Sequence, residues 1–500
     1  MENERALLST TGDEQEEPEL SVQDYLVHRW SSTHSSVDEG EDIPPIICAR
    51  QFSKAFARES KKLWYLAGPA IFTSLCQYSL GAITQTLAGH VGTLELAAFS
   101  IENSVIAGLS FGVMLGMGSA LETLCGQAYG AGSWVILLAT ASILMFLYIF
   151  ALPFLLLIGQ TEDISRAAGK LALWMIPQLY AYALNFPIAK FLQSQSKIMA
   201  MAWISAAALV LHVVFSWLLM LKLGWGMAGG AVVLNLSWWF IVLGQLVYIF
   251  SGTCGRAWTG FSWRAFRNLG GFVRLSLASA LMLCLETWYF MALVLFAGYL
   301  KNAEIAVDAL SICTNIVGWT VMVAIGFNAA ISVRVSNELG ADHPRTAKFS
   351  VLVVVVSSFL IALLISMFLL MFQKQYPSWF SDSLAVKEIV YQLTPLLLFC
   401  IVVNNVQPAL SGVAIGAGWQ ALVAYVNIAC YYLFGIPLGL VLGYVANIGV
   451  KGIWYGMVSG TLVQTMILFW IVCKTNWQKE ASVAAQRIKV WGGEPDDVEK

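Results

Sequence analysis

The ionisable residue in the most unusual surroundings is Glu286, which lies in the sequence LCLETWYFMALVLF, about halfway along an apolar segment near 275–298. If that segment crosses a membrane, a charged side chain at its centre costs about 3 kcal/mol unless it faces protein or water. Burial penalises the charged form and a bound proton removes the charge, so such a carboxyl can respond to a pH gradient. We predict that Glu286 binds and releases a proton. A hydrogen-bonded structural carboxyl is the alternative.

Two other acids lie nearer the ends of apolar segments. Asp308 begins the segment near 304–333, and Glu102 lies just inside the segment near 96–128, both toward the same side of the membrane. Either carboxyl could help a proton to reach the interior, but acids within a turn of an interface are more often simply hydrated. We assign Asp308, with Glu286, to cation coupling and leave Glu102 without a role.

The sequence lacks the motifs of enzyme and nucleotide chemistry. It contains no G-x-x-x-x-G-K-[ST] phosphate loop and no H-E-x-x-H zinc motif. Its nine cysteines lack the paired spacing of a metal site or a disulfide framework. The histidines are scattered, at His28, His34, His90, His212 and His343. The net charge is −2 without an extended basic block, so we predict no nucleic-acid partner. Because the motifs and the paired spacings are missing, we also predict no enzyme activity, no metal site and no cofactor.

Composition identifies the elements that must position these side chains. The 500 residues are 58% hydrophobic and 12% charged, with a mean hydropathy of +0.71, whereas soluble domains are about 25% charged. The apolar runs are long enough to cross a hydrocarbon core as helices of about 20 residues, and too continuous for barrel strands of about ten alternating residues. Backbone amides in lipid must hydrogen-bond within the protein, and helices satisfy them within each span. The predicted fold class is therefore an all-α polytopic membrane protein.

Twelve apolar segments form two groups of six. They lie near 63–87, 96–128, 134–158, 165–192, 198–222, 227–250, 275–298, 304–333, 346–373, 386–415, 419–445 and 452–473. We therefore divide the chain into a disordered N-terminal tail (1–60), a first lobe (61–250), an inter-lobe linker (251–274), a second lobe (275–474) and a C-terminal tail (475–500).

The distribution of basic residues predicts the orientation. Lys and Arg are denser on the side that holds the N-terminal tail and the linker than on the opposite side. Cytosolic loops carry such an excess. Both termini are therefore expected in the cytosol, and Glu338, at the cytosolic end of the eighth span, is expected at the membrane surface.

The two halves of the chain resemble each other at an offset near 210. Gly108 and Gly116 fall on Gly318 and Gly326, and AGHVGTLELA matches AGYLKNAEIA. Two similar six-helix halves are typical of transporters with a substrate site between them, although a purely architectural duplication is the alternative. Small-xxx-small spacing lets helices approach closely, and we expect such ladders to pack within each lobe of a monomer. The ladders are Gly108/Gly112/Gly116, Gly435/Gly439/Gly443 and Gly452/Gly456/Gly460.

Three longer motifs indicate a family. SALETLCGQAYGA, its repeat partner SVRVSNELGADHPRTAKFS, and VQPALSGVAIGAGWQ resemble those of eukaryotic MATE (multidrug and toxic compound extrusion) transporters. The resemblance covers roughly residues 58–475 and is strongest to the vacuolar-membrane group of plant DETOXIFICATION proteins. It implies two six-helix lobes in a V around a central cavity, and antiport of organic solutes against protons or sodium. It also implies a coupling acid in the seventh helix, where Glu286 stands.

Two departures from the family pattern bear on function. The basic linker that members usually carry after the second helix is missing at Gly132–Ser133. This is either a tighter loop with an intact fold or a deletion that weakens cytosolic closure. In the tenth span, where other members often place an acid, this chain has Asn404 and Asn405. That loss shifts the coupling role to Glu286 and leaves the second lobe less negative, which suits neutral, weakly acidic or anionic solutes.

Polar and aromatic side chains of the spans are candidates for the substrate cavity. Aromatic rings there could stack on a flat polyphenol, although aromatic residues in membrane helices are more often core residues or interface anchors. The predicted cavity residues are Gln77, Tyr78, Trp288, Tyr289, Asn404, Asn405 and Gln407. Prolines at corresponding places in the fourth and tenth spans are predicted helix hinges, namely Pro177, Pro187, Pro395 and Pro408.

These features predict a secondary active transporter that exchanges protons for organic solutes such as flavonoid or alkaloid conjugates, and carries them from the cytosol into the vacuole. A vacuolar anion (chloride) channel or exchanger is the alternative function. Sodium stays open as the coupling ion, and the plasma membrane is the alternative location. Glu2 before Leu7-Leu8 resembles an acidic dileucine sorting signal. The expected partners are small organic solutes or anions, protons and the lipid bilayer.

Overall fold

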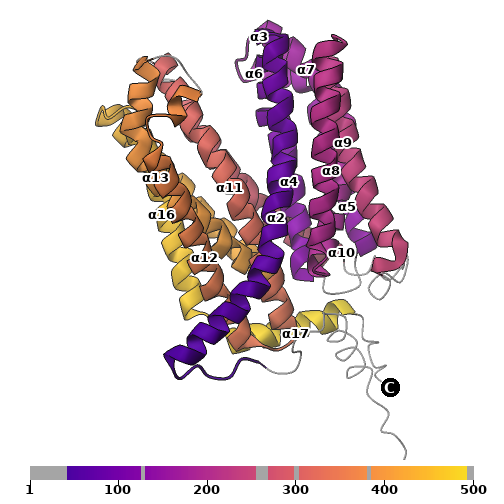
Figure 1. Ribbon diagram of the computed structural model, residues 1–500, viewed down its shortest axis with the longest axis vertical. Helices are drawn as coiled ribbons and strands as arrows, with labels where there is room; N and C mark the ends of the chain where they lie inside the picture. Colours follow the sequence, from indigo (N-terminus) through magenta and orange to yellow (C-terminus); the bar gives the residue numbers. More distant parts are fainter. Residues whose placement is uncertain (1–41, 125–129, 255–268, 298–302, 380–383, 493–500) are drawn as a thin grey trace, which may run out of the picture. The chain divides into compact units, whose positions relative to one another are not determined.

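The computed structural model describes residues 42–124, 130–254, 269–297, 303–379 and 384–492. In this part of the chain the regular structure is helical and no strand is present, in agreement with the predicted all-α class. The described residues belong to one compact unit, Glu41–Lys500, whose helices are labelled in Figure 1. The sorting signal at Glu2, the segment 125–129 that precedes Gly132, and most of the expected inter-lobe linker lie outside the described residues.

The helices follow one another in two sets. The first set comprises α2 (Ala49–Val91), α3 (Thr93–Ile101), η1 (Glu102–Ala107), α4 (Gly108–Leu124), α5 (Gly130–Ile149), α6 (Ala151–Leu157), α7 (Glu162–Ser194), α8 (Ile198–Ser216), η2 (Trp217–Lys222), α9 (Gly226–Tyr248) and η3 (Ile249–Thr253). The second set comprises α10 (Leu269–Ala297), α11 (Ala303–Gly340), α12 (Pro344–Met371), η5 (Tyr376–Trp379), α13 (Leu384–Ala417), α14 (Gln420–Asn427), η6 (Ile428–Gly435), α15 (Ile436–Leu440), η7 (Val441–Val445), α16 (Val450–Lys474) and α17 (Trp477–Gly492). Of the η segments, η5 is a 3-10 turn and the others are π-helical turns.

These helices occupy the places of the twelve predicted spans. Among the described residues, nine continuous segments are long and apolar enough to cross a membrane, and a tenth, α5 with α6, is bent by 63°. The helices α7 and α10 stand in the places of the fourth and seventh spans. At 1.5 Å per residue, the 43 residues of α2 extend about 65 Å, roughly twice the thickness of a hydrocarbon core. One end of α2 must therefore project beyond the membrane.

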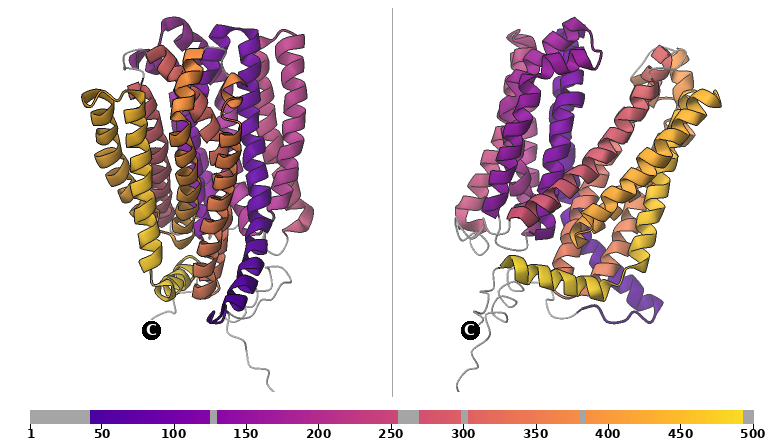
Figure 2. Two further views of the ribbon diagram at one scale, coloured as in Figure 1. Left: turned by 60° about the vertical axis from the view of Figure 1, so that its left-hand side comes forward. Right: turned by 180° about the vertical axis from the view of Figure 1, so that it is seen from behind.

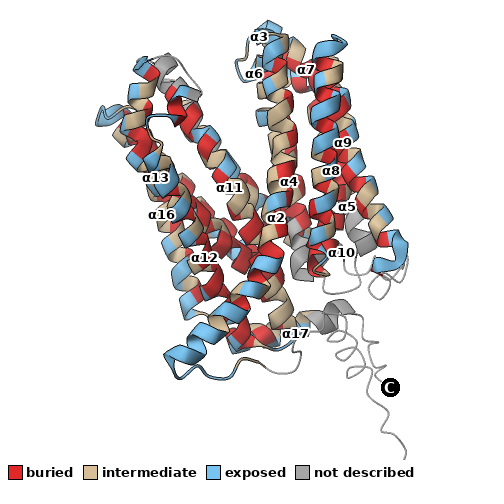
Figure 3. Cartoon of the chain, viewed as in Figure 1, coloured by how far each residue is buried: buried red, intermediate tan, exposed pale blue. Residues whose placement is uncertain are grey.

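The buried apolar side chains separate into cores that belong to two bundles. One core lies in the first set of helices and includes Phe99, Tyr148 and Leu179. Two cores lie in the second set, one around Phe327 and one around Tyr289. Figure 2 shows the two groups of helices within the Glu41–Lys500 unit. In Figure 3 the buried residues form stripes along the helices, and the apolar cores lie where helices of one group pack against each other. We call them the first and second bundle; each has an apolar interior of its own.

Helix α2 contributes to both bundles. Its first half places Leu63 and Ala70 in a core of the second bundle, beside Phe327 of α11. Its second half places Leu80 and Ala88 in the core of the first bundle. In Figure 1 the helix runs from beside α12 to α3. α2 is therefore a shared element rather than a member of one lobe.

Helix α10 also contributes to both bundles, but its first half packs in the first bundle and its second half in the second. Ala280, in its first half, belongs to the core of the first bundle, whereas Tyr289, in its second half, belongs to a core of the second. α10 packs along α4, as α2 packs along α11. The predicted internal repeat therefore relates two crossings, one made by α2 and one made by α10.

Two glycines related by the repeat make these crossings possible. A Cβ on Gly116 of α4 would lie 2.4 Å from Cα of Ala280 in α10. A Cβ on Gly326 of α11 would lie 2.7 Å from Cα of Ile71 in α2. Both distances are too short for non-bonded carbon atoms, so only glycine fits at either crossing without a shift of the backbone.

The glycine ladders were expected to pack within lobes, and for one of them this is wrong. Gly116 of the first ladder contacts α10, at the junction of the two bundles. The other two ladders do pack against each other within the second bundle, where a Cβ on Gly456 would lie 2.2 Å from Cα of Gly439. Spacing alone predicts close approach; the partner helix depends on the tertiary fold.

Both expected tails include ordered helix. α2 begins at Ala49, so residues 49–60 are helical rather than part of a disordered tail, because Phe52 packs edge-on against Phe349 of α12 at 5.8 Å. In the expected C-terminal tail, α17 packs against α11 and α12 and buries Trp477. Arg487 of α17 donates to the carbonyl at the end of α13 at 2.8 Å. The apolar residues on these polar helices are too widely spaced to stand out as spans.

Candidate functional site

Glu286 lies near the middle of α10, where that helix faces α13 and η6. Its neighbours are the amide of Gln407, which is near enough to hydrogen-bond with the carboxyl, and the phenol of Tyr431. The residue is half-buried, and none of the ion pairs among the described residues involves it. A carboxyl among neutral hydrogen-bonding groups can gain or lose a proton without breaking an ion pair.

Three predicted cavity residues lie together in α13, and one of them, Gln407, is the neighbour of Glu286. Asn404, Asn405 and Gln407 are all buried, and each donates within α13 to a residue one turn away. The acceptors are Sγ of Cys400 at 3.0 Å, the carbonyl of Ile401 at 2.8 Å and Oγ of Ser411 at 3.1 Å. Within the described residues, Oδ1 of Asn405 and the hydroxyl of Tyr431 have no hydrogen-bond partner. Buried polar atoms of this kind are ready to bind water or solute.

Side chains from the end of the second bundle hold α10 just before Glu286. Nδ2 of Asn427 donates to the carbonyl of Met282 at 3.0 Å, and the hydroxyl of Tyr432 donates to the carbonyl of Leu285 at 3.0 Å. Gln464 of α16 in turn donates to Oδ1 of Asn427 at 3.0 Å. The turn of α10 that precedes Glu286 is thus tied to α14, η6 and α16.

The remaining predicted cavity residues lie on α2 and α10, and one of them, Tyr289, contacts Tyr431. Gln77 and Tyr78 are on α2, where the ring of Tyr78 packs edge-on against Trp319 of α11 with the centroids 5.0 Å apart. Trp288 is 44% exposed. Tyr289 has no exposed surface; its ring stacks on Tyr431 at 4.4 Å and its hydroxyl donates to the carbonyls at Gly456 and Met457. In this conformation Tyr289 is a core residue.

The two acids near the segment ends differ in what the structure describes. Asp308 lies in α11, but its side chain is outside the described residues. Glu102 is the first residue of η1 and has no exposed surface, although the sequence suggested a hydrated position near the interface. It lies nine residues into its span, about 13 Å along the helix from Thr93.

The four predicted hinge prolines lie inside continuous helices. α7 contains Pro177 and Pro187, and α13 contains Pro395 and Pro408. Neighbouring helices contact two of them, because Nε1 of Trp239 donates to the carbonyl of Pro177 at 3.1 Å and Nδ2 of Asn328 donates to that of Pro408 at 2.7 Å. The hinge role stays a prediction.

Pro395 also borders a groove between α13 and α16. The groove has a volume of about 340 Å³, and Tyr455 and Phe399 in its wall are nearly half exposed. It includes none of the predicted cavity residues. It is therefore a feature of the outer surface rather than part of the site around Glu286.

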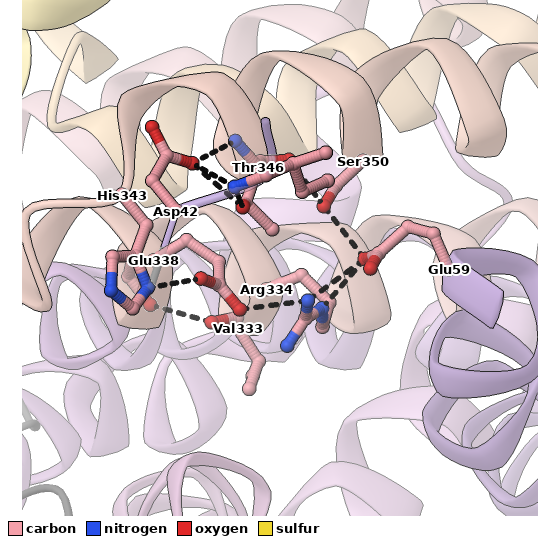
Figure 4. A network of polar contacts seen from close by, with 10 residues as sticks. Asp42, Glu59, Val333, Arg334, Glu338, His343, Thr346 and Ser350 are labelled. Carbon is pink, nitrogen blue, oxygen red and sulfur yellow. Dashed lines mark hydrogen bonds and ion pairs between the residues drawn. The ribbon is translucent and has the colours of Figure 1, made fainter. Parts of the chain in front are cut away.

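A cluster of ionised groups lies where α2, α11 and α12 meet (Figure 4). Arg334 of α11 pairs with Glu59 of α2 at 2.9 Å and with Glu338 at 2.7 Å, and Glu338 also contacts His343 at 3.0 Å. Glu59 accepts a further hydrogen bond from Ser350 of α12 at 2.7 Å. We call these five residues the Arg334 network. Glu59 is only 3% exposed, so its ion pair is shielded from solvent.

The segment before α2 is fixed to the same place by Asp42. Its carboxylate accepts hydrogen bonds from the backbone N–H groups of Arg345 and Thr346 at 3.0 and 2.8 Å. Partial burial by itself raises the pKa of Asp42, but these hydrogen bonds outweigh it and the pKa is lowered. The hydrogen bond to Glu338 raises the pKa of His343. The carboxylate of Asp42 lies at the N-terminus of α12, where the helix dipole also stabilises it.

Sequence reasoning placed Glu338 at the membrane surface and missed its partners. Arg334 and Glu338 are four residues apart in SVRVSNELG, a spacing typical of helical ion pairs, and this signal was available. Glu59 lies 275 residues away from Arg334, and no local pattern predicts that contact.

Comparison with known proteins agrees with this architecture. The family model MatE matches residues 69–218 and 278–441, whose starts differ by 209 residues (278 − 69), close to the repeat offset. Protein DETOXIFICATION 29 of Arabidopsis thaliana is 66% identical over 471 residues, covering 92% of this chain and 94% of that protein. Protein DETOXIFICATION 31 of the same plant is 62% identical over 507 residues, covering 98% and 97%.

Solved structures show the same fold. The crystal structure of the eukaryotic MATE transporter AtDTX14 matches with a TM-score of 0.82 at 35% identity, covering 87% of this chain and all of that one. The Vibrio cholerae MATE transporter VcmN in its bent form matches with a TM-score of 0.71 at 16% identity, which supports the fold alone. The family match extends over more than half of the chain and both Arabidopsis relatives cover nearly all of it. The chain therefore belongs to the MATE family, and it is a multi-pass membrane transporter rather than an enzyme.

Proposed function

We propose that this transporter exchanges protons for organic solutes and that Glu286 binds the coupling proton. The observation that carries the proposal is a carboxyl inside a membrane helix whose neighbours, Gln407 and Tyr431, are neutral. No ion pair within the described residues fixes its charge. One proton is then the smallest change that alters the electrostatics of the second bundle.

Loss of that proton has a structural consequence in α13. A buried carboxylate requires hydrogen-bond donors, and the amide of Gln407 is the donor of α13 that lies beside Glu286. Gln407 also donates to Oγ of Ser411 at 3.1 Å, so the two N–H groups of its amide can serve Glu286 and Ser411 together. Gln407 lies between Pro395 and Pro408. Ionisation of Glu286 therefore strengthens its contact with the part of α13 between the two predicted hinges. This contact couples the loss of the proton to the geometry of α13.

The solute class follows from the charges that the second bundle lacks. α13 presents Asn404 and Asn405 instead of an acid, so its interior is less attractive to polycations and suits neutral, weakly acidic or anionic solutes. Aromatic rings on α2 and α10, such as Tyr78 and Trp288, offer stacking surface for flat molecules. The name DETOXIFICATION of the plant relatives supports removal of harmful organic compounds.

We also propose the vacuolar membrane as the location, with both termini in the cytosol. The end of the molecule that carries α17 and the Arg334 network then faces the cytosol. Protons are concentrated in the vacuole, so their return to the cytosol drives solute in the opposite direction. Asp308, at the start of α11, is the proposed second coupling acid.

The test uses purified full-length protein in acid-loaded proteoliposomes, with valinomycin and potassium to clamp the voltage. Proton efflux is measured on addition of flavonoid glycosides, alkaloids or chloride. Glu286→Gln removes the proposed proton site and keeps the size of the side chain. Glu162→Gln is the matched control, because Glu162 is exposed and its pair with Arg166 contributes little.

We expect solute-dependent efflux in the wild type and in Glu162→Gln, and its loss in Glu286→Gln. A chloride current that ignores the pH gradient and persists in Glu286→Gln contradicts the proposal and identifies an anion channel. Solute exchange that follows a sodium gradient at constant pH contradicts proton coupling.

A further inference from the structure

The first bundle contains a carboxyl that the proposed mechanism does not use. Glu102 has no exposed surface, and neither Oε1 nor Oε2 has a hydrogen-bond partner within the described residues. Glu59 shows what a buried acid ordinarily requires, since it accepts hydrogen bonds from both Arg334 and Ser350. Glu102 lacks such donors although it is more deeply buried.

An unpaired carboxylate in this position is strongly disfavoured. Burial of an ion without a partner costs several kcal/mol, and such groups bind a proton and become neutral instead. A neutral carboxyl is a far smaller burden, because only its hydroxyl hydrogen and carbonyl oxygen remain to be satisfied. The packing around Glu102 therefore fits the protonated acid.

Among the residues that the structure describes, the titratable groups that interact with Glu102 are two phenols. Tyr148 comes from α5 and Tyr182 from α7, and both interact electrostatically with the carboxyl. Both tyrosines are buried in the apolar core of the first bundle. Tyr148 is hydrogen-bonded to Ser110, and Gln178 donates to the hydroxyl of Tyr182. The carboxyl thus belongs to a small polar cluster enclosed by apolar side chains.

The backbone at this cluster is also unusual. Glu102 begins η1, a π-helical segment of six residues between α3 and α4. A π-helical turn is less favourable than an α-helical one, and such turns occur frequently at functional sites. η1 packs against α7, the helix that supplies Tyr182. The irregular turn and the unpartnered acid are independent observations at the same place.

We propose that Glu102, with Tyr148 and Tyr182, forms a second proton-binding site, located in the first bundle and separate from Glu286. The site holds a proton rather than a metal ion, since the described residues contain no group of three acidic, histidine or cysteine side chains that could hold one. In the exchange only the O–H bond of the carboxyl breaks, and its proton passes to water. The phenol hydroxyls of Tyr148 and Tyr182 are placed to turn and donate to the carboxylate that remains.

The test detects the carboxyl group of Glu102 directly, by infrared spectroscopy of the full-length protein in lipid as the pH is raised. A protonated carboxyl has a C=O stretch that disappears on ionisation. Glu286→Gln removes the contribution of Glu286, and the double variant Glu102→Gln/Glu286→Gln removes both. The contributions of all other acids, including Asp308, cancel in the difference between these two samples.

We expect the difference spectrum to contain one protonated-carboxyl band that disappears at alkaline pH. Tyr182→Phe in the Glu286→Gln background should raise the pH at which the band disappears, because the carboxylate loses a hydroxyl donor, whereas loss of a distant structural tyrosine leaves this pH unchanged. Glu102→Asp in the same background keeps a carboxyl and should move the band without abolishing it. This second variant keeps the proposal open to refutation if Glu102→Gln does not fold.

Identical spectra of the single and double variants at all pH values would overturn the proposal. A carboxylate band from Glu102 at neutral pH would do the same, and so would a band that sodium displaces at constant pH, because that identifies an alkali-cation site. The readout involves no solute movement. Its result therefore stands whether or not Glu286 proves to be the coupling residue.

Discussion

The two glycine contacts at the crossings permit a sharp test of how the bundles are joined. Gly116→Ala and Gly326→Ala each add one methyl group where the backbone of another helix already lies. At Gly116 the new Cβ would be 2.4 Å from Cα of Ala280, and at Gly326 it would be 2.7 Å from Cα of Ile71. Ordinary contacts begin near 3.4 Å, so α4 and α10 must separate by about 1 Å.

The expected energy is the difference of two effects. Overpacking of this kind costs about 1–3 kcal/mol, and contact with backbone rather than with a flexible side chain places it at the upper end. Replacement of glycine by alanine in a helix returns about 1 kcal/mol. Each variant should therefore lose about 1–2 kcal/mol of unfolding free energy.

Gly112→Ala is the matched control. Gly112 lies one turn before Gly116 on α4, and a Cβ there would be 3.7 Å from Sγ of Cys284, an ordinary contact. The control should be stabilised by about 1 kcal/mol, so it should differ from Gly116→Ala by about 2–3 kcal/mol, roughly thirty- to 150-fold in the unfolding equilibrium. Thermal and denaturant unfolding of the purified protein in detergent measure this difference. If Gly116→Ala and Gly326→Ala unfold no more easily than Gly112→Ala, the backbone contacts do not constrain the crossings.

Three further predictions concern the end of the molecule that carries α17. Glu59→Gln and Arg334→Gln should each lower the unfolding free energy by about 3 kcal/mol, because each leaves a buried partner unpaired. The double variant should lose less than the sum of the two single losses, and additive losses in this double-mutant cycle contradict the pairing. The hydrogen bond to Glu338 raises the pKa of His343, so the stability contributed by protonated His343 is complete below about pH 6.5 and is lost as the pH rises through the higher pKa of the folded protein. His343→Gln should remove this part of the pH dependence of the melting temperature, and an unchanged pH profile refutes the assignment. Arg487→Gln should weaken the attachment of α17 by about 2 kcal/mol, which limited proteolysis reads as faster cleavage within α17 at an unchanged rate elsewhere.

The parts of the fold that were predictable from sequence depend on local physics. A membrane span is recognised by its own length and apolar content, so the order of the helices could be read before their packing was known. Glu286 was recognisable for the same reason, as an acid within one such segment. The repeat of Gly116 in Gly326 was visible as spacing, and it predicted close approach of helices without naming the partners.

The parts that were missed depend on contacts between distant segments. Glu102 is buried because α5 and α7 supply Tyr148 and Tyr182 beside it, and nothing in its own segment indicates this. Residues 49–60 look like a polar tail until α12 provides a surface for Phe52. Burial of a charged residue is a property of the assembled bundle, and its own helix predicts it poorly.

The division of α2 between the two bundles has a consequence for biogenesis. The first half of α2 leaves the ribosome among the earliest membrane segments, but its partners in α11 and α12 follow more than 230 residues later. Until they are inserted, Leu63, Ala70 and the acid Glu59 lack the surfaces that cover them in the finished protein. The amino-terminal half of the chain is therefore not a self-sufficient folding module. If the two halves are expressed as separate polypeptides, the first should resist degradation only in cells that also synthesise the second.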